Sequence, residues 1–158
     1  MQISEETIEK ILDLLYDSDE AKANAIMEQM GKNQPVILSY IMQMSEELEK
    51  TEERETLLFL AVLVWKSFHE TFGDLPEVGE EALKKAEDDL FLKMEMLEKT
   101  KDADAVVADE KQPVLMGFIA GEVFADKAES LSPEEHKSVA VHLTSLQVIT
   151  DTLQSVAL

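Results

Sequence analysis

Apolar side chains recur at helical spacing along almost the whole chain, and this periodicity limits the possible folds more than any other feature. The first segment shows the pattern at four positions: Ile8, Ile11, Leu12 and Leu15. A spacing of i, i+3, i+4, i+7 places such residues on one face of a helix. The chain has five glycines and four prolines, which leaves few places for the many tight turns of a β-fold. The sequence therefore predicts an all-α protein.

Start and stop signals divide the first half into four helices. Ser4 is expected to cap a helix over residues 5–16. Ser18 or Asp19 begins a second helix, which ends near Gly31 in the left-handed conformation that glycine adopts easily.

The third and fourth helices follow from the same kind of signal. Asn33 is expected to cap the third helix, with Pro35 in its first turn. Thr51 caps the fourth, which ends near Gly73. The inward stripe of the third helix is predicted to consist of Ile37, Tyr40, Ile41, Met44 and Leu48.

The second half of the chain resembles the first. A shift of 75 residues aligns residues 5–16 with residues 80–91, with five identities in twelve positions. A shift of 78 places Gln34-Pro35 on Gln112-Pro113, and a shift of 81 places Trp65 on Leu146. Both increases in shift fall in predicted connections or helix ends, as expected after a tandem duplication.

We therefore expect one domain over residues 1–158, a compact helical bundle or array of two tandem copies of a four-helix unit of ~75–80 residues. The copies are residues 1–76 and 77–158, and each carries a net charge of −10. A duplication predicts that a ligand or partner binds either to two equivalent faces of the protein or in one groove where the two copies meet. The alternative is a chance resemblance between amphipathic helical segments.

The two halves also differ. The run Leu57–Trp65 is apolar all round, whereas residues 138–146 retain polar side chains. The first-half helix is therefore expected either to be more central or to face a second subunit. Gly117 and Gly121 lie four residues apart, on one helix face, where they would allow another helix to approach closely.

The charge balance limits the partners. With 34 acidic and 14 basic side chains the net charge is −20, and the single arginine is Arg54. Nucleic acid and anionic membrane surfaces are therefore not expected as partners, because both are bound by clustered lysine and arginine. A charge of this sign favours solubility and association with a basic protein surface.

No targeting segment is expected at the start of the chain, because residues 1–16 carry four carboxylates where a signal peptide needs a basic region. The longest apolar stretch, Leu57–Trp65, is too short for the roughly 20 residues that span a bilayer. A cytoplasmic protein is the resulting expectation. There is no cysteine, which excludes disulfides and thiolate ligands.

Motifs that signal enzymes or metal sites are absent. The sequence has no Gly-rich phosphate loop, no G-x-S-x-G and no H-E-x-x-H. The residues three before His69, His136 and His142 are not carboxylates, which argues against a di-iron bundle. An EF-hand-like window that starts at Asp17 has Lys22 where the loop needs glycine. No cofactor, no metal and no catalytic activity are therefore expected.

Candidate binding residues come from an aromatic stripe and from two glutamines. The stripe consists of Trp65, Phe68, His69 and Phe72, and Tyr40 joins it as a further candidate. One interpretation is that the stripe lines a pocket or a groove for a partner. The preferred interpretation is that it packs in the core, which is the more common role of such a stripe.

The paired glutamines Gln34 and Gln112 are the sharpest feature that the two halves share. Each either opens a helix, where it satisfies free backbone amides or solvent, which is the preferred interpretation, or is buried. A buried side-chain amide would form hydrogen bonds with a peptide backbone or hold the two halves in register.

On these grounds the expected function is that of a non-catalytic acidic helical adaptor or regulatory protein that binds another protein, with a basic protein surface as one class of partner. The alternative is a helical bundle that binds a small apolar ligand between the two copies. A homodimer on the Leu57–Trp65 helix is compatible with both, and it predicts that Val64→Glu or Leu60→Glu yields a monomer or unfolded protein.

Overall fold

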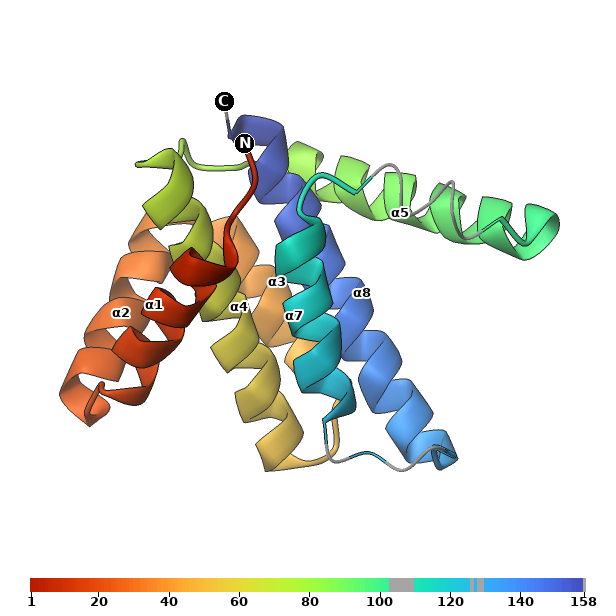
Figure 1. The fold of residues 1–158 in the computed structure, drawn as a ribbon, viewed down its shortest axis with the longest axis horizontal. Coiled ribbons are helices and arrows are strands. Elements are labelled where there is room, and N and C mark those ends of the chain that lie inside the picture. The colour runs from red at the N-terminus through yellow and green to blue at the C-terminus, as the bar shows by residue number, and fades with distance from the viewer. Residues whose placement is uncertain (103–109, 126, 128–129, 158) are drawn as a thin grey trace.

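The computed structural model describes residues 1–102, 110–125, 127 and 130–157, and within these residues it contains seven α-helices and no strand (Figure 1). The predicted all-α fold is confirmed. The helices are α1 (Glu5–Tyr16), α2 (Glu20–Asn33), α3 (Pro35–Ser45), α4 (Thr51–Phe72), α5 (Glu80–Thr100), α7 (Pro113–Phe124) and α8 (Pro133–Val156).

The two long helices α4 and α8 pack against each other in the middle of the molecule. Helices α1, α2 and α3 pack on α4, and helices α5 and α7 pack on α8. Three further contacts cross between the groups, because α1 also packs on α7 and α3 also packs on both α5 and α8. Figure 1 shows α1 and α2 on one side, α7 and α8 on the other, and α5 extending sideways from the body.

Local signals explain several helix ends. The Ser4 hydroxyl accepts a hydrogen bond from Thr7 N at the start of α1, and Asp19 Oδ1 accepts one from Lys22 N at the start of α2. Ser132 and Glu135 form a capping box at the start of α8. These hydrogen bonds satisfy amides that have no partner within the helix.

Three predicted helix ends are wrong. Asn33 is the last residue of α2 and does not cap α3, because its side chain accepts a hydrogen bond from Trp65 Nε1 instead. Thr51 is the first residue of α4, and Lys50 occupies the cap position without a side-chain hydrogen bond. Gly31 lies inside α2, so the left-handed end expected there does not occur, whereas Gly73 does end α4 with φ of 79°.

Helix α4 shares the centre of the molecule with α8, because nine residues of α4 and ten of α8 are buried, so α4 is not the more central of the two. Seven of the nine residues in Leu57–Trp65 are buried, and Leu58 and Phe59 are half-buried. Leu60 and Val64 are 2% and 0% exposed within a single chain. The homodimer surface expected on this helix is therefore already covered by α1, α3 and α8.

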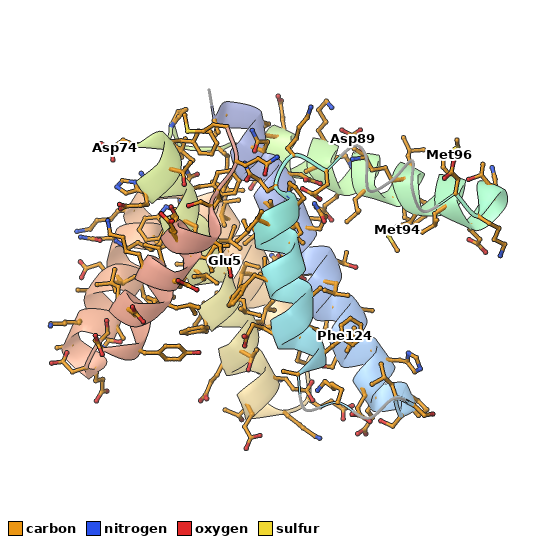
Figure 2. All side chains as sticks on the ribbon, in the orientation of Figure 1. Glu5, Asp74, Asp89, Met94, Met96 and Phe124 are labelled. Atoms are coloured by element: carbon orange, nitrogen blue, oxygen red, sulfur yellow. The ribbon has the colours of Figure 1, made fainter. Side chains whose placement is uncertain are left out.

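The described part of the second half differs from the first in the length of its first helix. Helix α5 continues to Thr100, nine residues beyond the position aligned with the end of α1, and Met94 and Met96 near its free end are exposed (Figure 2). A counterpart of α2 would occupy residues 95–111, of which residues 95–100 belong to α5 and residues 103–109 lie outside the described residues.

The close helix contact expected at Gly117 and Gly121 is also wrong. Both glycines are exposed, and a Cβ built at either position would have no atom within 4 Å. Over the part of the chain that the structure describes, no helix is long and apolar enough to cross a membrane.

Candidate functional site

The predicted aromatic stripe belongs to the hydrophobic core. Trp65 and Phe68 are 4% and 0% exposed, and Phe68 stacks on Phe72 with ring centroids 5.6 Å apart. Trp65 Nε1 donates to Asn33 Oδ1 at 2.9 Å, which ties α4 to the end of α2. Packing thus favours the core interpretation of the stripe over a pocket.

The two polar aromatic candidates lie in different places. His69 is half-buried at the end of α4, where its Nε2 lies 3.4 Å from Asp74 Oδ1. Tyr40 is buried among α3, α5 and α8. Burial raises the pKa of Tyr40 to about 12, the Glu87 carboxylate adds to this rise, and the neighbouring Ser145 hydroxyl opposes it. Tyr40 is therefore a protonated structural residue at neutral pH.

Each glutamine stands at the cap position that opens a helix, but both side chains are fully buried and bind the backbone of a distant segment, so the less favoured, buried interpretation applies. Gln34 Nε2 donates to Pro76 O at 2.9 Å, and Gln34 Oε1 accepts from Val78 N at 2.9 Å.

Gln112 makes the same two kinds of bond at the start of the chain. Its Nε2 donates to Met1 O at 3.2 Å, and its Oε1 accepts from Ile3 N at 2.8 Å. Each glutamine thus clamps two backbone groups two residues apart, in an extended segment that precedes a helix. The seven predicted site residues accordingly occupy several separate places and do not form one site.

An open apolar groove lies between α1, α2 and the first half of α4. We call it the α1–α2–α4 groove, and its volume is about 220 Å³. Its apolar lining includes Leu15, Ile26, Met27, Leu58, Phe59 and Val62. The Tyr16 ring stacks on Phe59 at 5.5 Å and is itself 68% exposed. Glu55 is the charged residue among the lining side chains.

The elements around this groove are acidic. The segment from Asp13 to Glu28 carries five carboxylates and one lysine, all of them exposed. Glu52 and Glu55 on α4 are exposed as well. The groove therefore combines an apolar floor with a negative surround.

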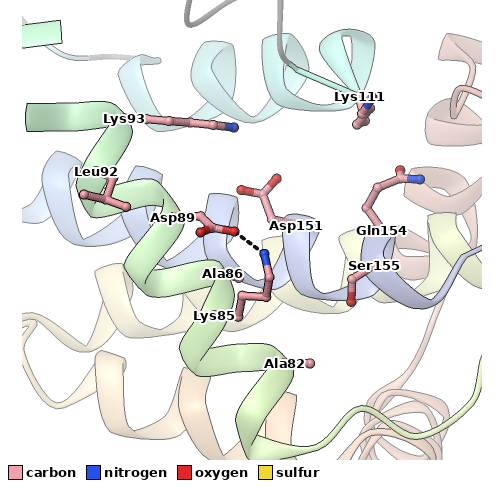
Figure 3. Close-up of a pocket in the computed structure, with 10 residues that line it drawn as sticks. All are labelled: Ala82, Lys85, Ala86, Asp89, Leu92, Lys93, Lys111, Asp151, Gln154 and Ser155. Atoms are coloured by element: carbon pink, nitrogen blue, oxygen red, sulfur yellow. Dashed lines mark hydrogen bonds and ion pairs between the residues drawn. The ribbon is translucent and has the colours of Figure 1, made fainter. Parts of the chain in front are cut away.

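A second groove lies between α5 and α8 and has a volume of about 640 Å³ (Figure 3). We call it the α5–α8 groove. The residues that line it are Ala82, Lys85, Ala86, Asp89, Leu92 and Lys93 of α5, Lys111 before α7, and Asp151, Gln154 and Ser155 of α8. Lys85 Nζ donates to Asp89 Oδ2 at 2.7 Å. Figure 3 shows the Asp151 carboxyl pointing into the groove between this ion pair and the ammonium groups of Lys93 and Lys111.

Asp151 is the most unusual group in the α5–α8 groove. Burial raises its pKa from 3.8 to about 6, a hydrogen bond from Gln147 opposes the rise, and the carboxylates of Glu110 and Asp89 add to it. The Lys93 ammonium lowers the pKa. The Gln147 amide holds the two carboxyl groups together, because its Nε2 donates at 2.9 Å to both Asp151 Oδ1 and Glu110 Oε2.

The chemistry available in this groove is that of ammonium groups and one carboxyl group that titrates near neutrality. Such an arrangement can bind an anion and can take up or release a proton. Over the described ranges, no three histidine, aspartate or glutamate side chains are placed to hold a metal ion.

The sequence interpretation missed both grooves. Lys85, Asp89 and Lys93 are spaced by four residues and resemble an ordinary solvated helix face. The available signal was Asp151, because no other aspartate, glutamate, lysine or arginine follows Lys137 along α8. A single charged side chain of this kind in so long a stretch of helix suggests a specific local role.

No protein-family model, curated protein or solved structure matches this chain. Function is therefore inferred from the two grooves, from their side chains and from the charge around them.

Proposed function

We propose that this chain is a non-catalytic helical protein that binds another protein by docking a basic amphipathic helix of that partner in the α1–α2–α4 groove. The observation that carries the proposal is the apolar floor of the groove, open to solvent and surrounded by carboxylates. Helix-in-groove recognition uses such a floor for the apolar face of the ligand helix.

The floor supplies anchor positions of the kind found in protein interfaces. Phe59, Leu58 and Met27 are half-buried, so each retains apolar surface that a partner side chain can cover. Methionine is flexible and polarizable, and it adapts to the shape of a ligand.

Charge selects the class of partner. Lysine and arginine on the flanks of a ligand helix would face Glu52, Glu55 and the acidic segment from Asp13 to Glu28. Complementary charge of this kind speeds association and discriminates between partners. A second copy of this chain is a poor occupant, because two molecules of charge −20 repel each other.

Helix α2 supports an adaptable groove. Met30 is its one fully buried residue, and α2 packs mainly on α3 and α4. A helix held by few buried contacts shifts at a low energetic cost.

We also infer that residues 1–76 and 77–158 are two copies of one unit. The two glutamine clamps support this, because Met1 and Ile3 precede Pro76 and Val78 by the same 75 residues that align the two halves. The reciprocal packing of α1 on α7 and of α5 on α3 supports it further.

The alternative function, a small apolar ligand between the copies, has less support. The aromatic side chains expected to surround that ligand are packed in the core, and Trp65 and Phe68 are buried. The apolar surface open to a ligand lies between α1, α2 and α4.

The test is binding of a synthetic peptide of about five helical turns, with leucines at i, i+3, i+4, i+7 and lysines elsewhere. Fluorescence anisotropy would measure its affinity for the wild type and for Met27→Lys. We expect Met27→Lys to weaken binding by about tenfold, because it places a like charge on the apolar floor.

Met42→Lys is the matched control, since Met42 is an exposed methionine of α3 outside the groove. Its affinity should stay within about twofold of wild type, because the long-range charge change is identical. An equal loss in both variants would mean diffuse attraction to an acidic surface and would overturn the proposal.

A further inference from the structure

We propose that the α5–α8 groove is a binding site for a small organic carboxylate, and that the ligand binds together with a proton on Asp151. This site is separate from the α1–α2–α4 groove and does not depend on the function proposed there. Three observations support the site: a difference between the two halves, the polar groups that line the groove, and its apolar floor.

The corresponding place in the first half is closed by an ion pair. Lys10 of α1 binds Glu70 of α4, and the shifts that align the halves place these residues on Lys85 and Asp151. In the second half Lys85 binds Asp89 instead, and Asp151 accepts a hydrogen bond from Gln147. The ion pair that ties α1 to α4 is therefore missing between α5 and α8, where the groove is open.

The polar lining suits a carboxylate ligand. Lys93 and Lys111 bring ammonium groups to one side of the Asp151 carboxyl (Figure 3). Gln112 Nε2 donates to Gln154 Oε1 at 2.7 Å, which leaves the amide nitrogen of Gln154 as a donor toward a ligand. Ammonium and amide N–H groups are the donors that carboxylates accept most strongly.

The floor of the groove favours an organic anion over an inorganic one. Ala82, Ala86 and Leu92 line it beside the charged groups, and they offer a surface to a carbon skeleton. Ala86 stands where the alignment places Ile11 in the first half, so a smaller side chain creates the space. The overall charge of −20 excludes long polyanions, because repulsion from the rest of the chain grows with their length.

Proton uptake follows from the charges around Asp151. The groups that face it are Lys85, Asp89 and Lys93 on α5, and Glu110 and Lys111 before α7. An ionised Asp151 repels a carboxylate ligand, whereas a protonated one donates a hydrogen bond to it. With the pKa of Asp151 at about 6, affinity should fall by up to about tenfold per pH unit above that value.

The experiment is a titration with succinate, followed by amide chemical shifts of the full chain at about pH 5 and about pH 7.5. We expect saturable shifts in α5 and near the end of α8, with an affinity at least about tenfold higher at the lower pH. Asp151→Asn should lose most of this pH dependence, because its side chain cannot ionise, and the dependence that remains reports the ionisation of succinate itself. Inorganic phosphate is titrated separately, and tighter binding of phosphate than of succinate would overturn the assignment of an organic ligand.

Lys111→Gln and Lys84→Gln form a matched pair. Lys111 lines the groove, whereas Lys84 lies beside Lys85 on α5 and does not line it. We expect a loss of about tenfold for Lys111→Gln and a change within about twofold for Lys84→Gln. Equal losses would show diffuse attraction, and an absence of saturable shifts at both pH values would show that there is no site. Either result would overturn the proposal.

Discussion

Glu70 of α4 and Asp151 of α8 are both carboxylates, and the alignment of the two halves places them together, yet their environments move their pKa values in opposite directions. Glu70 is exposed, and its hydrogen bond and ion pair with Lys10 lower its pKa. Asp151 is largely buried, and burial raises its pKa to about 6. The surroundings of a carboxylate, and not its place in an alignment, therefore determine whether it is a surface ion or a titrating group.

Three substitutions account for the difference. Asp151 is one methylene shorter than Glu70 and reaches less far toward the neighbouring helix. Asp89 replaces Leu14, which gives Lys85 a partner on its own helix at i+4. Ala86 replaces Ile11, which opens space beneath them. At the aligned positions, an ion pair joins α1 to α4 in the first half, whereas a groove lies between α5 and α8 in the second.

Helices α4 and α8 pack against each other, and the other helices pack on them. The Val64→Glu substitution should disrupt this central packing. Val64 is 0% exposed, so the variant buries an unpaired charge and should lose about 4 kcal/mol or more of stability. Circular dichroism and size-exclusion chromatography should show unfolded protein. A folded monomer obtained from a wild-type dimer would contradict burial within one chain.

Gln34→Ala and Gln112→Ala test whether the two clamps are equivalent. Each substitution removes two hydrogen bonds to backbone groups, at Pro76 and Val78 or at Met1 and Ile3, and should lower the free energy of unfolding by about 2–4 kcal/mol. Urea denaturation measures the loss. Gln29→Ala, at an exposed glutamine of α2, should change stability by less than about 0.5 kcal/mol. Losses that differ widely between Gln34→Ala and Gln112→Ala would argue against equivalence.

Asp151→Asn and Glu70→Gln should change stability in opposite directions at neutral pH. The folded pKa of Asp151 lies above its unfolded value of 3.8, so the folded state binds the proton more tightly and stability falls as pH rises from about 4 to about 6. Asp151→Asn removes this cost and should stabilise the protein by up to about 3 kcal/mol above pH 6. The gain should vanish near pH 4, as measured by urea denaturation across pH.

The contribution of Glu70 to stability changes with pH in the opposite direction. Its folded pKa is lowered, so it stabilises the protein at neutral pH, and this contribution is lost as pH falls through the folded pKa. Glu70→Gln should therefore destabilise the protein slightly at neutral pH and have no effect in acid. Destabilisation by Asp151→Asn at neutral pH would show that the buried carboxylate is stabilised by its lysine neighbours and would refute the comparison.

The smallest expected effect concerns the glycines of α7. Gly117→Ala and Gly121→Ala should each raise the free energy of unfolding by about 0.5–1 kcal/mol, because alanine favours the helix and its Cβ meets no other atom at either position. Thermal denaturation would show the gain as a higher Tm. Gly73→Ala should lower stability, because φ of 79° strains any residue with a Cβ.

Much of the fold was predictable because helix ends are set by neighbouring residues. Ser4, Asp19 and Gly73 act at helix ends as predicted, since each bonds or bends within a few residues along the chain. The central place of α4 followed from its all-round apolar run. Asn33 failed as a cap because Trp65, 32 residues away along the chain, takes its side-chain oxygen.

The binding surfaces were harder to predict. The aromatic stripe drew attention because aromatic side chains are typical of pockets, but the same property makes them good core residues. The burial of Gln34 and Gln112 was foreseen only as an alternative, because their partners are backbone groups that carry no sequence signal. Both grooves arise from the spacing between helices.

The sequence by itself determined the helices, most of their ends and the strong negative charge. All of these depend on residue type and on spacing along the chain. The tertiary structure alone decided which carboxylate is buried, which lysine pairs with which acid and where the helices part to leave a groove. The physical reason is that burial and pairing depend on distances of a few ångströms between helices, and one methylene or one exchange of isoleucine for alanine changes those distances.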